Sequence, residues 1–320
     1  MKNWVKITIG IIISSVLLAV LFQFISFGDI LSQVKQMSLS TLLGAFLIYS
    51  VIYVLKTQRF RYLFGENIKF SKLFPVVCLH NLFNQVIPMR IGELSFVYLT
   101  KKFNKINIGE SAASLLIARV YDGLMIILIM VATAFFISNV PEGILFYVYL
   151  ISGIFFISIA VMAVLFIGRK KILPIITKIA RKLAEKKIVP GKMIEKGKAL
   201  KSRLSTAVHS RKHSMIFMYS LAIWVLSYVF FAVVIKGISP EIETAKVIFA
   251  ASLVNLGLFI PLHSFANIGT SEGIWSISLI VLGVSRTIAI GSAIILHSIQ
   301  IIFFLIWGLF GFIAVLARKQ

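Results

Sequence analysis

The stretch Asn81-Leu-Phe-Asn-Gln-Val-Ile-Pro-Met-Arg-Ile-Gly-Glu93 decides the fold, because it places amides, charges and helix breakers inside apolar sequence. A weaker copy follows much later, as Asn255-Leu-Gly-Leu-Phe-Ile-Pro261 and then Asn267-Ile-Gly-Thr-Ser-Glu272. In lipid such groups cost free energy unless they line a cavity or face other protein. Two related breaks, one in each half of a chain, indicate a transporter-like binding site.

Composition indicates a membrane protein. Of the 320 residues, 59% are hydrophobic and 14% are charged, whereas soluble domains carry roughly 25% charged residues. Mean hydropathy is +0.98. The net charge of +22 comes from Lys and Arg that cluster beside the apolar runs, which is typical of cytoplasmic loops and argues against nucleic-acid binding. We expect a multi-pass protein of the cell membrane with both termini in the cytoplasm.

Motifs for catalysis, cofactors and metals are missing from the sequence. The single cysteine, Cys78, excludes an intrachain disulfide. Neither a P-loop nor a metal-ligand pattern is present, so we expect no cofactor and no metal. No Ser/His/Asp constellation can be assembled, and we expect that the protein is not an enzyme.

The apolar runs predict an all-α polytopic membrane protein with about six transmembrane helices and two re-entrant helical hairpins, related as an inverted repeat. The predicted spans are 1–27, 39–55, 111–137, 144–168, 214–236 and 287–316. Residues 27–39 are expected to form an external loop. Lys56, Arg59 and Arg61 are expected to mark the cytoplasmic exit of the second span.

The predicted hairpins cover about residues 70–103 and 244–284. In the first, apolar pieces of about 16 and 9 residues reach roughly 24 Å and 14 Å, short of the roughly 30 Å hydrocarbon core. Lysines flank the first hairpin at both ends, whereas the flanks of the second are acidic or sparse. We therefore expect the hairpins to enter the membrane from opposite faces.

Matching residues occur at the hairpin tips and beyond them. The tip residues that we expect to allow tight backbone geometry are Pro88, Gly92, Pro261 and Gly269. The repeat continues into the next helix, since Arg119 follows Gly92 by 27 residues and His297 follows Gly269 by 28.

A basic segment, 169–213, separates a first membrane half, 1–168, from a second, 214–320. It holds fifteen Lys or Arg against two Glu, and its apolar residues recur at helical spacing. One interpretation is that it forms amphipathic helices that bind the anionic inner leaflet. The other is a plain cytoplasmic loop, which is basic for topological reasons alone.

Arg119 and Asp122 are ionisable residues deep in a predicted span. Arg119 lies about nine residues from Glu110, roughly 13 Å at the helical rise. Such residues are functional by default, so Arg119 is predicted to reach the cavity at the Pro88 tip and to bind a phosphate or carboxylate. The alternative is that Arg119 and Asp122, three residues apart, neutralise each other.

Further cavity residues are predicted from the two motifs. Arg90 suits bidentate phosphate recognition, and Glu93 could be the partner of Arg119, a cation site or a proton carrier. The alternative for both is a salt bridge that closes the hairpin. The other predicted cavity residues are Asn84, Asn255, Glu272 and His297. For the Asn residues helix capping is the alternative, and for His297 a structural hydrogen bond.

Two motifs resemble a known family. The segment Asn84-x-x-x-Pro88-x-Arg90-x-Gly92-Glu93, followed by Ser111-Ala-Ala-Ser-Leu-Leu-Ile-Ala-Arg119-Val-Tyr-Asp122, is similar to the lysylphosphatidylglycerol synthase transmembrane-region family, also called flippase-like. The segment Pro261…Gly269…Glu272 resembles its second signature, and the likeness covers nearly the whole chain. The family usually has Gly where this chain has Met89, and often Arg where it has His297.

The resemblance implies a function in lipid movement. The best-understood members join a membrane flippase domain to a soluble synthase domain, and a chain ending at Gln320 is expected to hold only the first. We expect translocation of a phospholipid or polyprenyl-phosphate-linked lipid, with anionic inner-leaflet lipids bound at 169–213. A membrane scaffold for a partner lipid synthase or glycosyltransferase, an intramembrane lipid-modifying enzyme, and a homo-oligomer stay open as alternatives.

Overall fold

The computed structural model describes residues 19–66, 68–87, 91–137, 153, 157, 213–257 and 264–318, and in these ranges regular structure is helical throughout. Among the described residues, four helices are long and apolar enough to cross a membrane: α3 (Leu39–Leu63), α6 (Ile108–Ala134), α10 (His213–Ile238) and α13 (Arg286–Leu316). The predicted all-α multi-pass membrane fold is thereby confirmed. Several predicted features lie outside the described residues: most of the spans 1–27 and 144–168, nearly all of the loop 169–213, and Pro88, Arg90 and Pro261.

Both predicted hairpins are present as pairs of short helices. The first consists of α4 (Phe70–Val86), the single turn η1 (Ile91–Glu93) and α5 (Leu94–Asn104). The second consists of α11 (Thr244–Gly257), η3 (Phe265–Asn267) and α12 (Thr270–Val281). In each hairpin the two arms pack against each other, and each arm is shorter than the roughly 20 residues that a helix needs to cross the hydrocarbon core.

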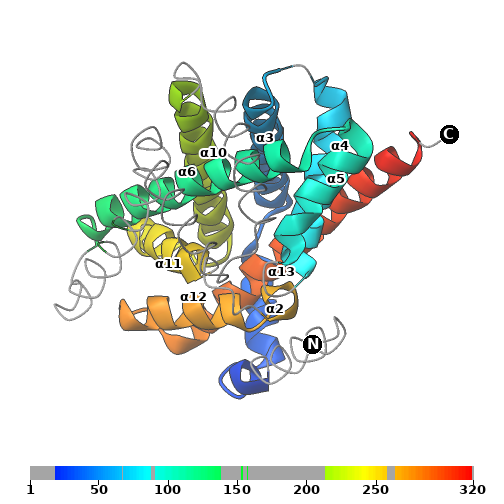
Figure 1. Cartoon of the computed structure of the whole chain (residues 1–320). Helices are drawn as coiled ribbons and strands as arrows, with labels where there is room; N and C mark the ends of the chain where they lie inside the picture. The colour runs from blue at the N-terminus through cyan, green and yellow to red at the C-terminus, as the bar shows by residue number, and fades with distance from the viewer. Residues whose placement is uncertain are drawn as a thin grey trace, which may run out of the picture.

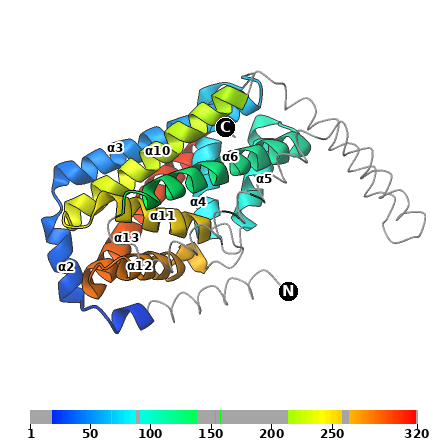
Figure 2. The ribbon, with the colours of Figure 1, turned by 90° about the vertical axis from the view of Figure 1, so that its left-hand side faces the viewer.

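The order span, hairpin, span occurs twice, and the two copies have opposite orientations. The first spans, α3 and α10, lie side by side (Figure 2). They are antiparallel, because Gly237 near the end of α10 lies against Thr41 near the start of α3. At the other end Arg59 of α3 hydrogen-bonds Ser220 of α10. Equivalent helices that run antiparallel place the two halves upside down relative to each other, as in an inverted repeat.

Each hairpin packs against a membrane span of the other half. The last span of the second half, α13, packs on α4 of the first hairpin, and the last span of the first half, α6, packs on α11 of the second (Figure 1). The α13–α4 contact is close because a Cβ atom on Gly311 would lie 2.7 Å from the carbonyl oxygen of Pro75. Small residues permit such backbone approach between membrane helices. Each hairpin is thus held against the other half.

Two parts of the structure differ from the sequence predictions. The predicted loop 27–39 contains a helix, α2 (Phe27–Gln36), whose start is stabilised by a reciprocal capping box between Ser26 and Asp29. The second span continues past the predicted end at 55, so Lys56 and Arg59 lie within α3. Arg59 is only 3% exposed. It is tolerated there because a carboxylate from another helix neutralises it.

Candidate substrate cavity

A cavity of about 190 Å³ lies where α3, α4, α6 and α10 approach the hairpin tips. Its charged lining residues are Lys56, Arg59, Glu93, Arg119 and Asp122, and its amide residues are Asn81, Asn84, Gln85, Asn255, Asn267 and Gln300. A second cavity of about 70 Å³ shares four of these amides and adds His297. Polar side chains therefore line a path that begins in the first half of the molecule and ends in the second.

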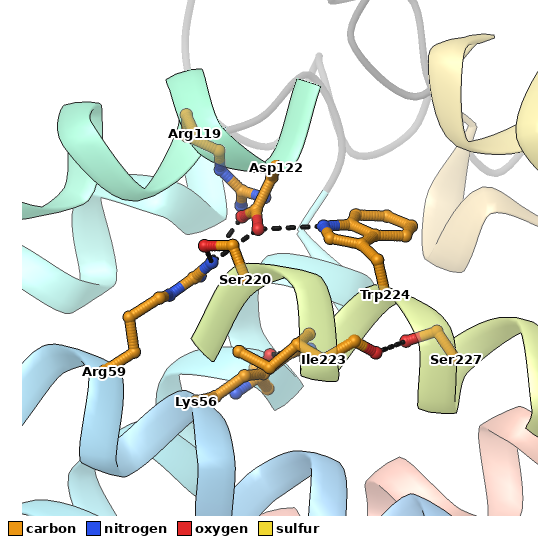
Figure 3. Close-up of polar contacts among 9 residues, drawn as sticks. Lys56, Arg59, Arg119, Asp122, Ser220, Ile223, Trp224 and Ser227 are labelled. Atoms are coloured by element: carbon orange, nitrogen blue, oxygen red, sulfur yellow. Dashed lines mark hydrogen bonds and ion pairs between the residues drawn. The ribbon is translucent and has the colours of Figure 1, made fainter. Parts of the chain in front are cut away.

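The buried carboxylate of Asp122 gathers residues from three helices (Figure 3). Arg59 Nη1 and Nη2 donate to Oδ1 and Oδ2 at 2.5 Å and 3.2 Å. Trp224 Nε1 donates to Oδ1 at 2.9 Å, and Ser220 Oγ accepts from Arg59 Nη1 at 2.9 Å. Removing two charges from water is unfavourable unless their remaining polar atoms are satisfied. Here the bidentate contact, the Ser220 hydroxyl and the indole satisfy part of these atoms, whereas Arg59 Nε has no acceptor among the described residues.

Arg119 forms an ion pair with the hairpin. Its Nη2 lies 3.2 Å from Glu93 Oε1, whereas its Nη1 lies 4.0 Å from Asp122 Oδ2. The structure therefore brings together the three predicted residues Glu93, Arg119 and Asp122. The closest cation to the Asp122 carboxylate, however, is Arg59, and Arg119 lies farther away. The side chains of Arg119 and Glu93 are 28% and 20% exposed, so this pair faces the cavity.

The second half holds a matching pair. His297 Nδ1 lies 2.8 Å from Glu272 Oε1, with side chains 10% and 5% exposed. Glu272 Oε2 also accepts a hydrogen bond from the Gly269 amide at 2.8 Å, at the start of α12. Glu93 precedes Arg119 by 26 residues and Glu272 precedes His297 by 25. Each half thus pairs an acid from the hairpin with a base on the following span.

The hairpin tips meet through amides. Asn267 Nδ2 donates to Gln85 Oε1 at 2.9 Å, which joins the second tip to the first. Asn84 lines the larger cavity, and Asn255 lines both while its amide donates to the Ala251 carbonyl of its own helix at 2.7 Å. The centre of the path is therefore lined by uncharged amide side chains that can donate and accept hydrogen bonds.

The glycines at the two hairpin tips have different structural roles. A Cβ atom on Gly92 would lie 2.6 Å from the Cα of Asn84, so this glycine allows η1 to touch α4. Gly269 has a φ of 86°, a conformation that residues with a Cβ rarely adopt.

Four residues of the cavity were not predicted from the sequence: Lys56, Arg59, Trp224 and Gln300. Lys56 and Arg59 were interpreted as flanking charges because basic residues usually mark the end of a span. Their spacing of three was an available signal, since it places both on one helix face. In the described part of the chain, no group of three or more His, Cys, Asp or Glu residues is arranged to hold a metal ion.

Fold and cavity together define a class: a multi-pass, all-helical membrane protein whose two inverted halves enclose a polar path. The family model described as the lysylphosphatidylglycerol synthase TM region matches residues 7–308, and the chain belongs to this family. The resemblance expected from the motifs is confirmed over nearly the whole chain. No curated protein matches the chain closely enough to count as a relative.

Proposed function

We propose that this protein moves an intact phospholipid, or a polyprenyl-phosphate-linked lipid, between the leaflets of the cell membrane, without covalent chemistry on the lipid. The observation that carries the proposal is the polar path between the hairpin tips, which connects an acid–base pair in each half. Family membership supports it, because the family takes its description from the membrane region of a lipid synthase.

The size and chemistry of the path indicate how a lipid would use it. A charged headgroup is strongly unfavourable in hydrocarbon, and the ionic and amide side chains offer it a replacement for water. The two cavities, of about 190 Å³ and 70 Å³, are smaller than the roughly 300–1,000 Å³ of sites that enclose whole ligands. The acyl chains would therefore stay in the bilayer while the headgroup passes between the halves.

Reconstitution in liposomes tests the proposal. The purified protein should increase the exchange of fluorescent phosphatidylglycerol between leaflets, measured as the fraction of label accessible to an impermeant quencher. Arg119→Ala should abolish this exchange and Arg119→Lys should keep part of it, because Lys retains charge but loses the planar fork. Lys102→Ala, at an exposed position on α5, is the matched control. Exchange no faster than in protein-free liposomes, across anionic, zwitterionic and cationic lipids, would refute the proposal.

The proposed orientation places both termini and the segment 169–213 in the cytoplasm, where the basic segment would contact anionic lipids. A background in which Cys78 is replaced permits a direct test with Lys105→Cys and Pro190→Cys. An impermeant thiol reagent should label neither position in intact cells and both after permeabilisation. Labelling of either position in intact cells contradicts the orientation.

A further inference from the structure

Three cations line the larger cavity in the described part of the chain, but only two carboxylates do: Lys56, Arg59 and Arg119 stand against Glu93 and Asp122. Arg59 is paired with Asp122, and Arg119 with Glu93. Within the described residues no carboxylate oxygen lies within 4.0 Å of Lys56 Nζ. One cation of the cavity is therefore left without an opposite charge from these residues.

The surroundings of Lys56 do not replace a counter-ion. Its Nζ donates to Asn81 Oδ1 at 3.3 Å, which is long for such a bond, and lies 5.7 Å from the centre of the Tyr53 ring. An ammonium group has three donors. Lys56 lies seven residues before the end of α3 at Leu63, roughly 10 Å at the helical rise. A cation at that depth is unfavourable unless it is paired or reaches water.

Two neighbouring guanidinium groups also have an N–H donor without an acceptor among the described residues. The Nε atoms of Arg59 and Arg119 are buried and have no hydrogen-bond acceptor among the described residues. Both arginines line the same cavity as Lys56, and Lys56 lies one turn before Arg59 on α3 (Figure 3). Buried donors without acceptors are rare in folded proteins. A ligand with several anionic oxygens would balance the excess positive charge of these three side chains.

We propose that Lys56 is the principal phosphate-binding residue of the cavity, oriented by Asn81, and that the ligand is the phosphate of a lipid headgroup. This inference rests on the proposed function and names the site on which that function depends. Arg119 then forms the ion pair with Glu93 of the hairpin and adds positive charge to the phosphate site. A lysine ammonium is a point charge and does not bind phosphate through two parallel hydrogen bonds, as arginine does. This suits a transport site, because a transported ligand must also be released.

Binding to the purified full-length protein in detergent tests the site. The probes are dihexanoyl-phosphatidylglycerol, dihexanoylglycerol, which lacks the phosphate, and inorganic phosphate. Wild type should prefer the phosphatidylglycerol to the dihexanoylglycerol. Lys56→Met should weaken phosphatidylglycerol binding by about tenfold to a hundredfold, the size of one charge-assisted hydrogen bond, and leave dihexanoylglycerol binding unchanged. The matched control, Lys102→Met, removes an exposed lysine of α5 that does not line the cavity and should bind like wild type.

Thermal stability separates a binding role from a structural one. If Lys56 is an unpaired cation in the ligand-free protein, Lys56→Met should unfold at the same temperature as wild type or at a higher one. If Lys56 holds the bundle together, the midpoint should fall. A fall in midpoint with unchanged phosphatidylglycerol affinity overturns the proposal. Lys56→Arg should bind phosphatidylglycerol within about tenfold of wild type, because the charge remains.

The remaining outcomes distinguish the site from the function. Phosphate-dependent binding that is lost in Lys56→Met, in a protein that moves no lipid in liposomes, supports the site and refutes the proposed function. Lipid exchange that persists at the wild-type rate in Lys56→Met, with unchanged affinity, supports the function and refutes the site. Displacement of phosphatidylglycerol by an equal concentration of inorganic phosphate would assign the site to a free anion and overturn the lipid-headgroup part of the proposal.

Discussion

The two halves of the molecule share their architecture but differ in how many charges they bury. Each has an acid–base pair, Glu93–Arg119 in the first half and Glu272–His297 in the second. The first half adds Asp122, three residues after Arg119, and the second half has Gln300 three residues after His297. The helices that supply the partner of Asp122 and its counterpart, α3 and α10, differ in the same way.

Arg59 stands four residues before the end of α3 at Leu63, and Val234 stands four residues before the end of α10 at Ile238. The base is thus replaced by an apolar residue in the half where the matching acid is replaced by an amide. Breaking a buried ion pair by removing one partner is strongly destabilising, and in the second half both positions that correspond to Arg59 and Asp122 have lost their charge. The repeat preserves the arrangement of the helices, whereas the Arg59–Asp122 pair is present in the first half alone among the described residues.

The largest effect should come from breaking the extra pair of the first half. Asp122→Ala leaves Arg59 buried without its carboxylate, and we expect a loss of about 3–5 kcal/mol in the free energy of unfolding. Replacing both partners, Arg59→Met with Asp122→Leu, makes this site apolar like the second half and should restore most of that loss. Thermal unfolding in detergent measures both. A double variant as unstable as the single one would show that the carboxylate has a role besides balancing Arg59.

A smaller effect is expected at the tip of the first hairpin, compared with an open glycine position in the second hairpin. Gly92→Ala places a Cβ against the backbone of α4, and overpacking of this kind typically costs about 1–3 kcal/mol. The control Gly273→Ala lies on α12, where a Cβ meets nothing within 4 Å, and it should stay within about 1 kcal/mol of wild type or stabilise the helix. Chemical denaturation of the purified protein provides the comparison. Equal stability of the two variants would mean that η1 can move away from α4.

The smallest difference concerns the two acid–base pairs. Glu272→Gln removes the charge from a nearly enclosed pair and weakens the acceptor of the Gly269 amide, and about 2 kcal/mol should be lost. Glu93→Gln acts on a pair that is more open to the cavity, where screening reduces ion pairs to about 1 kcal/mol or less. Unfolding midpoints of the two variants under identical conditions test the order. A greater loss for Glu93→Gln would show that the first pair carries more of the hairpin's stability than its exposure indicates.

Much of the fold could be predicted from sequence because its causes are local. Short apolar pieces around Pro88 and the region of Gly269 indicated hairpins, and the similar spacings of Arg119 after Gly92 and of His297 after Gly269 indicated a repeat. The partners of Asp122 could not be predicted in the same way. Arg59 lies 63 positions away and Trp224 lies 102 away, and a single sequence does not show which helices face each other.

The helix α2 was missed for a different reason. The prediction of an external loop at 27–39 did not consider Ser26 and Asp29, whose side chains form the capping box at the start of the helix. The side chain of Gln33 shows what the helix does, because it is buried against α13, with its amide 3.5 Å from the Thr287 carbonyl. Tertiary contact of this kind stabilises a ten-residue helix that would be marginal alone.

The position of Arg59 also bears on how the chain is synthesised. Translation delivers α3 to the membrane with Lys56 and Arg59 near one end, and the neutralising Asp122 emerges 63 residues later. Because both members of the pair belong to the first half, the ribosome need not reach α10 before the charge is balanced. Ser220 and Trp224 then arrive with α10 and complete the hydrogen bonds. The charge of Arg59 can therefore be neutralised within the first half before the second half is made.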